Sequence, residues 1–140
     1  MHYSFDLTIP KKTAITDEEK LVCNLNYGIL RKLDIFFKDG CAGLVHVRVL
    51  RWNKQIFPSN PDVYYVDNDY HLSFEEYYPI LEMPYTLELR GYNEDDFRQH
   101  IINFRFLLIH PKAIAMATGT PIAQTELEAL LGTYEVGGGT

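Results

Sequence analysis

Cysteine and histidine are the side chains here that could act as nucleophiles, bases or metal ligands. Neither cysteine, Cys23 or Cys41, belongs to a motif that would place a histidine base beside its thiol. The histidines are His2, His46, His71, His100 and His110. None stands in an HExxH pair or another ligand spacing, and neither a GxSxG elbow nor a glycine-rich phosphate loop occurs. We therefore predict no catalytic site, no metal site, no cofactor and no enzymatic activity.

Two pairings of these side chains stay open at the level of sequence. Sheet pairing could bring His46 beside His100, although nothing in their spacing requires it. Cys23 and Cys41 could form one disulfide, but two unpaired thiols are expected in a reducing cytoplasm.

Acidic residues crowd the middle of the chain and raise the question of a cation site. Asp62, Asp67 and Asp69 lie close to Asn60 and Asn68, and such oxygens are the ligands that calcium prefers. Their spacing fits no EF-hand loop, which also needs a glycine and a late glutamate. We favour solvated loop acids and keep a bound cation as the alternative.

A second acidic pair, Glu75 and Glu76, stands beside Tyr77 and Tyr78. This pattern resembles two carboxylates next to sugar-stacking rings. Adjacent residues of a strand point to opposite faces, so the two acids would not meet one substrate. The pattern therefore argues against glycoside hydrolysis.

Aromatic side chains make up 14% of the chain, with 10 tyrosines and 8 phenylalanines. Five of them fall at expected loops or strand ends: Trp52, Tyr64, Tyr65, Tyr77 and Tyr78. They could anchor a partner subunit, pack over the ends of the domain, or form a platform for carbohydrate. We favour the partner interface and keep a carbohydrate-binding module as the alternative function.

The strands that would position these residues are organised around residues 43–57. Val45, Val47 and Val49 alternate with polar or larger residues, which is typical of a central strand with one buried face. Further alternating or apolar runs cover residues 1–10, 19–26, 29–37, 70–74, 85–92 and 99–109. The last two are expected to form a hairpin, and residues 75–84, which contain two prolines, are expected to be irregular.

This pattern predicts an all-β fold, an antiparallel β-sandwich that is jelly-roll-like, with about eight strands. An up-and-down barrel is the nearest rival. The sandwich domain is expected over residues 1–111, and residues 112–140 form what we call the C-terminal arm. A short helix is predicted between Thr120 and Gly132, with a partial apolar stripe. The stripe consists of Ile122, Leu127, Leu130 and Leu131, which join the candidate interface.

Charge and hydropathy limit the classes of partner that the chain is expected to bind. The net charge of −6 argues against binding nucleic acid through its phosphates. No apolar run approaches the ~20 residues of a membrane span, and the N-terminus lacks the pattern of a signal peptide. No membrane association and no small-molecule ligand are expected, and the chain is expected in the cytoplasm or in a larger assembly built there.

The segments YSFDLTIP, GCAGLVHVRVLR, IFPSNPD, LSFEEYYP and PYTLELRGYNEDD resemble small, mostly uncharacterised β-sandwich proteins from phages and phage-like gene clusters. The resemblance covers residues 1–111 and carries no catalytic motif. It implies a non-enzymatic structural protein of a virus particle, capsid-associated or a head or tail component, assembled in the host cytoplasm. It further implies a homo-oligomer that contacts other virion proteins.

Overall fold

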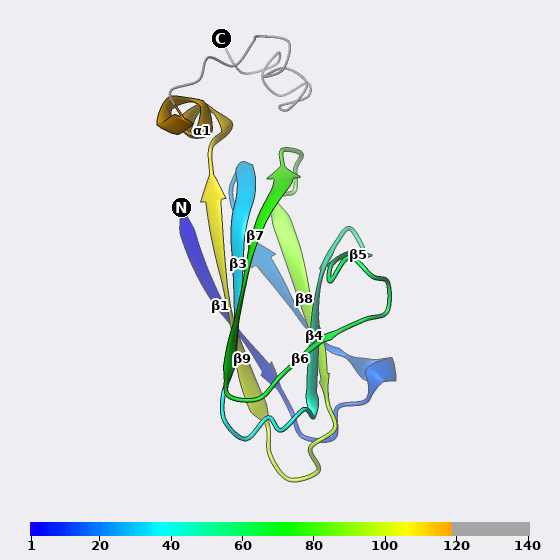
Figure 1. The fold of residues 1–140 in the computed structure, drawn as a ribbon. Coiled ribbons are helices and arrows are strands. Elements are labelled where there is room, and N and C mark those ends of the chain that lie inside the picture. The colour runs from blue at the N-terminus through cyan, green and yellow to red at the C-terminus, as the bar shows by residue number, and fades with distance from the viewer. Residues whose placement is uncertain (119–140) are drawn as a thin grey trace.

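The structure is a computed structural model that describes residues 1–118 of the chain. Its strands build two layers that face each other (Figure 1). The start of β1 and the end of β9 lie at the same end of the molecule. The strands are β1 (His2–Ile9), β2 (Glu19–Asn24), β3 (Gly28–Phe37), β4 (Val45–Arg51), β5 (Lys54–Phe57), β6 (Tyr65–Val66), β7 (Tyr70–Ile80), β8 (Thr86–Asn93) and β9 (His100–Ile109). A 3-10 helix occupies Ile15–Asp17, and helix α1 occupies Pro111–Thr118.

The strand order identifies the topology. Sheet A has the order β1-β9-β3-β7, and sheet B has the order β2-β8-β4-β5, with β6 also paired to β4. The chain can be followed as one long hairpin whose arms pair β1 with β9, β2 with β8, β3 with β7, and β4 with β5. Successive pairs fall in alternate sheets, which is the winding of a jelly roll. Each sheet keeps two edge strands, so the predicted sandwich is confirmed and the barrel is excluded.

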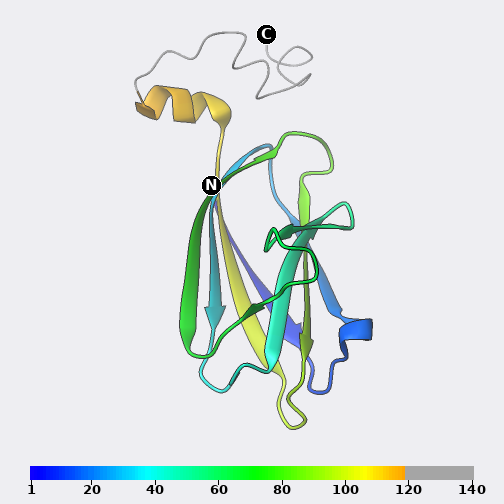
Figure 2. The ribbon, with the colours of Figure 1, turned by 45° about the vertical axis from the view of Figure 1, so that its right-hand side comes forward.

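Figure 2 shows the two sheets as facing layers. The buried core is made of side chains from both sheets, as the alternation predicted. Val45, Val47 and Val49 have no exposed surface, and they face apolar residues of sheet A such as Leu33 and Ile35. Burial of each such side chain is worth roughly 1.5–3 kcal/mol. The valine strand is therefore the central part of sheet B, between β8 on one side and β5 and β6 on the other.

The expected hairpin of the last two strands is wrong. Strand β8 pairs with β2 and β4 in sheet B, whereas β9 pairs with β1 and β3 in sheet A. The connection between them crosses from one sheet to the other. It is anchored by the buried Asn93, whose side-chain amide donates to the carbonyls of Ile9 (3.3 Å) and Arg98 (3.0 Å). Residues that look like a turn thus form a sheet-to-sheet crossover.

The expected irregular segment after Phe74 is also wrong, because β7 continues to Ile80. Strand β7 is an edge strand of sheet A, and proline is tolerated at an edge because no neighbour needs its missing N–H. Pro79 lies opposite Ile29 of β3. The alternation along β7 leaves Glu75 exposed and Glu76 half-buried, which agrees with the opposite orientations expected for that pair.

Helix α1 was not predicted. Pro111 opens it at a position where proline costs no hydrogen bond, and alanines follow at 113, 115 and 117. The His110 ring nitrogen Nδ1 accepts a hydrogen bond from the Lys112 amide (3.1 Å), as a capping side chain does. The helix predicted between Thr120 and Gly132, with its apolar stripe, lies outside the described residues.

Neither helix in the described part of the chain combines the length and apolar character that crossing a bilayer requires.

Candidate functional site

Two of the predicted interface aromatics stand on the surface. Trp52 is 57% exposed in the turn between β4 and β5, and Tyr77 is 67% exposed on β7. An arginine guanidinium group lies over each ring. Arg51 is 4.1 Å from the Trp52 ring centroid, and Arg31 is 4.0 Å from the Tyr77 ring centroid. Both residues therefore keep more than half of their surface exposed to solvent.

The other predicted aromatics are half-buried and serve the fold. Tyr65 of β6 stacks on Phe74 of β7 with ring centroids 5.3 Å apart. Tyr78 of β7 meets Phe57 of β5 edge to face at 5.7 Å. These contacts join the edge of sheet A to the edge of sheet B, which is the packing role that the sequence left open.

Tyr64 belongs to a charged cluster on the outer face of sheet B. Its hydroxyl donates to Glu18 Oε2 (2.9 Å), and Arg48 holds the same carboxylate through Nε (3.0 Å) and Nη2. Burial, aided by the Glu18 carboxylate, raises the pKa of Tyr64 to about 12. The cluster fastens the loop after β5 onto the sheet, so its charges are used within the molecule.

The structure brings together three residues that no sequence motif connects. Cys41 Sγ lies 3.8 Å from His100 Nδ1, and His100 Nε2 lies 2.8 Å from Asp95 Oδ2. In the neutral imidazole, a proton on Nε2 donates to the carboxylate and leaves Nδ1 to accept from the thiol. The order of groups is that of a cysteine nucleophile, its base and an orienting acid.

The setting of this chain of groups opposes nucleophilic chemistry. Cys41 has no exposed surface, and burial raises the pKa of its thiol, which disfavours the reactive thiolate. We therefore assign Cys41, His100 and Asp95 to a buried hydrogen-bond chain that joins the β3–β4 turn to β9. Sequence reasoning missed it because only the strand pairing brings residues 41, 95 and 100 together.

The other cysteine and histidine side chains considered from the sequence lie apart from one another. Cys23 and Cys41 are both unpaired and buried, and burial raises the pKa of Cys23 to about 12. His46 lies in sheet B, where it stacks on Tyr92 (4.3 Å), whereas His100 lies in sheet A. The two histidines therefore do not form a pair.

The acidic loop considered for calcium is tied to the backbone of the β3–β4 turn. The Asn68 side-chain oxygen accepts hydrogen bonds from the amides of Gly40 (3.0 Å) and Ala42 (2.7 Å). Asp67 accepts from the amide of Asn68 (2.8 Å). Within residues 1–118, no group of three or more His, Cys, Asp or Glu side chains is placed to hold a metal ion.

The outer face of sheet A carries a connected polar network that the sequence did not reveal. Asn103 donates to Asp6 Oδ1 (2.8 Å) and accepts from Arg105 Nε (3.1 Å). The Arg105 guanidinium lies 4.7 Å from the Phe36 ring centroid, and Phe36 stacks on His71 at 4.0 Å. These five residues, which we call the sheet A network, come from all four strands of the sheet. The sequence showed that these residues alternate with apolar ones along their strands. It did not show the register between the strands, which brings the residues together.

Asp34 extends this network along β3. Its Oδ1 lies 2.9 Å from His71 Nε2 and 4.0 Å from Lys32 Nζ. Partial burial alone would raise the pKa of this carboxyl, but hydrogen bonds from Ser73 and His71 outweigh it and lower the pKa. The carboxylate is thus a fixed acceptor at the middle of the face.

Two hollows open beside Arg105 on this face. The larger, of about 580 Å³, is lined by Asp6, Phe36, Phe37, Lys38, Asp69, Tyr70, His71, Asn103 and Arg105. The other, of about 520 Å³, is lined by His2, Tyr3, Ser4, Lys32, Asp34, Arg105, Phe106 and Leu107. Tyr70, the first residue of β7, is one of the aromatic residues that line the larger hollow.

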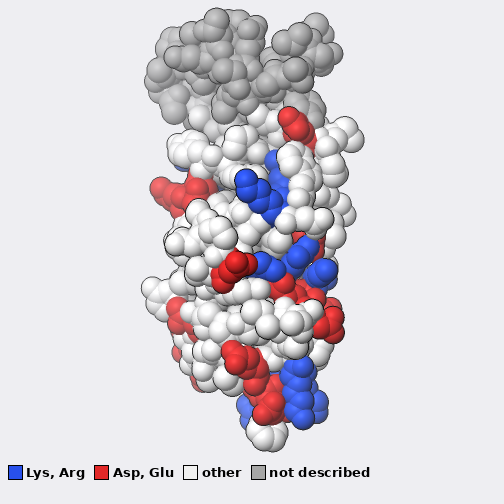
Figure 3. All heavy atoms as spheres, turned by 90° about the vertical axis from the view of Figure 1, so that its right-hand side faces the viewer, with Lys and Arg blue, Asp and Glu red and all other residues white. Residues whose placement is uncertain are grey.

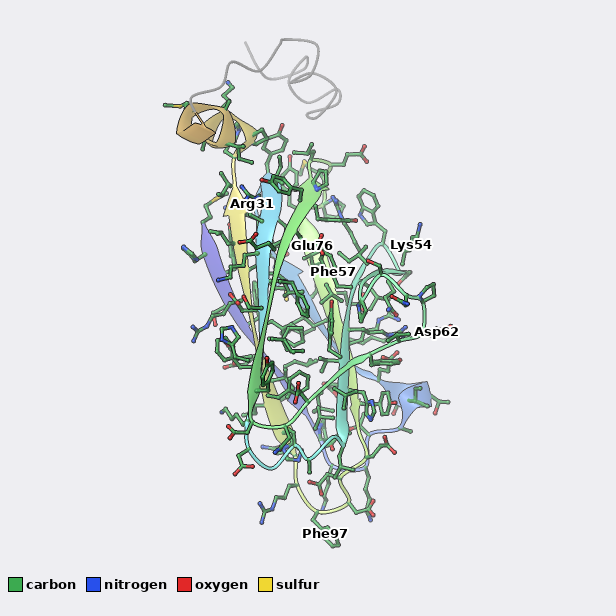
Figure 4. The ribbon with its side chains drawn as sticks, viewed as in Figure 1. Arg31, Lys54, Phe57, Asp62, Glu76 and Phe97 are labelled. Atoms are coloured by element: carbon green, nitrogen blue, oxygen red, sulfur yellow. The ribbon has the colours of Figure 1, made fainter. Side chains whose placement is uncertain are left out.

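Sheet B carries an exposed apolar pair. Val22 of the edge strand β2 is 58% exposed, and it shares a small hollow of about 170 Å³ with Trp52. We call these two residues the Val22–Trp52 patch. Another exposed ring, Phe97, is 86% exposed at the tip of the β8–β9 connection, at the opposite end of the molecule from α1 (Figure 4).

Charges on the visible side of the molecule are mixed in sign. Figure 3 looks onto the side that carries β5 and the 3-10 helix, where acidic and basic groups alternate and neither sign dominates. This side therefore offers no broad basic surface for a nucleic acid.

Neither a protein-family model, nor a curated protein, nor a solved structure matches the chain.

Proposed function

We propose that this protein is a non-enzymatic structural protein of a virus particle that works by symmetric self-assembly and by contacts with other virion proteins. The class rests on the sequence resemblance and on the jelly-roll topology, a fold in which viral capsid domains occur. Fold alone does not determine function, so the mode of assembly is argued from the surface.

The main support for self-assembly is the exposed Val22–Trp52 patch. Strand β2 is an edge of sheet B, and an edge strand presents unpaired backbone groups to solvent. Two copies related by a two-fold axis would place β2 beside β2 and bring the outward-facing Val22 and Trp52 of both onto one continuous sheet face. Strand addition of this kind combines backbone hydrogen bonds with apolar contacts.

The buried thiol supports a role without catalysis. The chain of groups at Cys41, which is ordered like a nucleophile, base and acid, is closed to solvent. Its contribution is to hold the β3–β4 turn against β9, which suits a rigid building unit.

The test is the mass of the full chain in solution, measured by sedimentation over a range of concentrations up to about 1 mM, where even weak association is visible. We expect a concentration-dependent oligomer that Val22→Lys weakens. Phe97→Lys is the matched control, because it adds the same charge at an exposed apolar site at the far end of the molecule.

Two results would reject the proposal. One is a chain that remains monomeric at the highest concentration and is absent from purified particles. The other is an oligomer that Val22→Lys and Phe97→Lys affect equally.

A further inference from the structure

The larger hollow on the outer face of sheet A has a lining with mixed chemistry, and none of its residues belongs to the patch assigned to assembly. We propose that this hollow, beside Arg105 and Tyr70, is a binding site for a neutral saccharide. Its volume of about 580 Å³ lies within the range of small-molecule sites. This function is separate from self-assembly and does not depend on it.

The polar groups of the hollow fit hydroxyl groups. Arg105 uses only Nε for its bond to Asn103, and its two terminal nitrogens have no hydrogen-bond partner in residues 1–118. Asp6, which also lines the hollow, accepts from Asn103 through Oδ1, so its second carboxylate oxygen is not used in that bond. A sugar hydroxyl both donates and accepts, so a donor fork beside a carboxylate matches two neighbouring hydroxyls.

The aromatic groups supply the complementary apolar surface. The Tyr70 ring lines the hollow and is 56% exposed, although aromatic rings prefer to be covered. The C–H face of a pyranose ring is apolar and of a size to cover it. Phe36 and His71, stacked at 4.0 Å, form the floor nearby.

The charges of the hollow favour a neutral ligand. Its lining holds two carboxylates, Asp6 and Asp69, and two cations, Lys38 and Arg105, so their formal charges cancel. A phosphate or a polyanionic chain would meet Asp6 and Asp69 in addition to the net charge of −6 on the protein. A polyhydroxylated, uncharged molecule meets neither repulsion.

The site is preorganised. Asn103 is held by Asp6 and by the Ser4 hydroxyl (3.0 Å), and it in turn orients Arg105. Phe36 supports the guanidinium plane from the adjacent strand. Groups that are already fixed lose little entropy when a ligand binds, which favours recognition of a ligand through few contacts.

The experiment uses the full chain on a glycan array that carries defined neutral and acidic oligosaccharides. Affinity is then measured by NMR titration with the neutral glycan that gives the strongest signal. We expect binding of at least one neutral glycan. Tyr70→Ala and Arg105→Ala should each weaken it about tenfold or more, because each removes a principal contact. Tyr77→Ala is the matched control, since it removes an exposed tyrosine of the same strand outside the hollow.

Several results would overturn the assignment. One is the absence of binding to any neutral glycan at about 10 mM, since this concentration detects very weak sites. The others are binding to acidic glycans only and an affinity that Tyr70→Ala leaves unchanged. A loss of affinity in Tyr77→Ala as large as in Tyr70→Ala would also place the site elsewhere. Tyr70 is exposed, so its variant stays informative even if Arg105→Ala proves unstable.

Discussion

At the scale of single residues, the Asp95 carboxylate holds the β8–β9 connection in place through several hydrogen bonds. Its Oδ1 accepts hydrogen bonds from the amides of Phe97 (2.8 Å) and Arg98 (3.2 Å), and its Oδ2 meets His100. The hydrogen bond from His100, followed by that from the Phe97 amide, lowers the pKa of this carboxyl. Asp95 therefore binds the crossover from sheet B to sheet A in its charged form.

This pKa shift predicts loss of stability in acid. A carboxyl whose pKa is lower in the folded state contributes stability above its unfolded pKa of about 4, and that stability disappears as the pH falls through the folded value. Urea unfolding at pH about 5 and about 3 should show a smaller pH effect in Asp95→Asn than in the unmodified chain. Asp34, whose pKa is also lowered, should act in the same direction. Parallel pH curves for the variant and the unmodified chain would contradict this assignment.

At the scale of elements, the packing of β8 against its neighbours depends on Gly91. A Cβ atom at this position would lie 2.6 Å from Ile9 Cδ1 and 2.8 Å from the carbonyl oxygen of His46. We expect Gly91→Ala to lower the free energy of unfolding by about 3 kcal/mol, the upper part of the usual range for overpacking. Chemical denaturation measures this change.

Gly28→Ala provides the comparison for Gly91→Ala. The nearest atom to its added Cβ is the carbonyl oxygen of Ile109 at 3.3 Å, so a small shift accommodates the methyl group. We expect a smaller loss than at Gly91. Equal losses at the two glycines would show that backbone freedom, and not the close approach of β8, decides the effect.

The central strand gives the second prediction at this scale. Val47 has no exposed surface in the middle of β4, so Val47→Asp places a charge in the core at a cost of several kcal/mol. Against a typical stability of roughly 5–15 kcal/mol, we expect the domain to unfold. Val22→Asp is the matched control, since it makes the same change at a 58% exposed position. Circular dichroism separates the two, and a folded Val47→Asp with an unchanged melting temperature would contradict the assigned core.

These elements also show what the sequence could and could not predict. Alternation located the core valines of β4 and the buried face of β3, because a side-chain period of two is a local property. The sheet to which β8 and β9 belong, and the length of β7, depend on which strands become neighbours. The Cys41–His100–Asp95 chain and the sheet A network depend on register across strands distant in sequence, so no local pattern indicated either.

At the scale of the whole molecule, the sandwich core and helix α1 are separate in their packing. The buried core cluster of the described residues ends at Leu108, one residue before the end of β9. Helix α1 follows beyond the end of the sandwich (Figure 1), and Ala113 lines a hollow together with Met1 and Tyr27. The start of the arm therefore touches the domain at its end and adds nothing to that cluster.

This separation leads to a prediction for removal of residues 112–140. Because the core cluster lies before this point, we expect the melting temperature to change by less than about 5 °C, which corresponds to roughly 1 kcal/mol in a domain of this size. We also expect weaker self-association, since the arm was predicted to dock on a neighbour. Calorimetry and sedimentation measure the two effects on the same sample. A second truncation that removes only residues 119–140 separates the part played by α1 from that of the remainder. A fall of tens of degrees would place the arm in the fold itself, and unchanged association would show that the arm has no part in assembly.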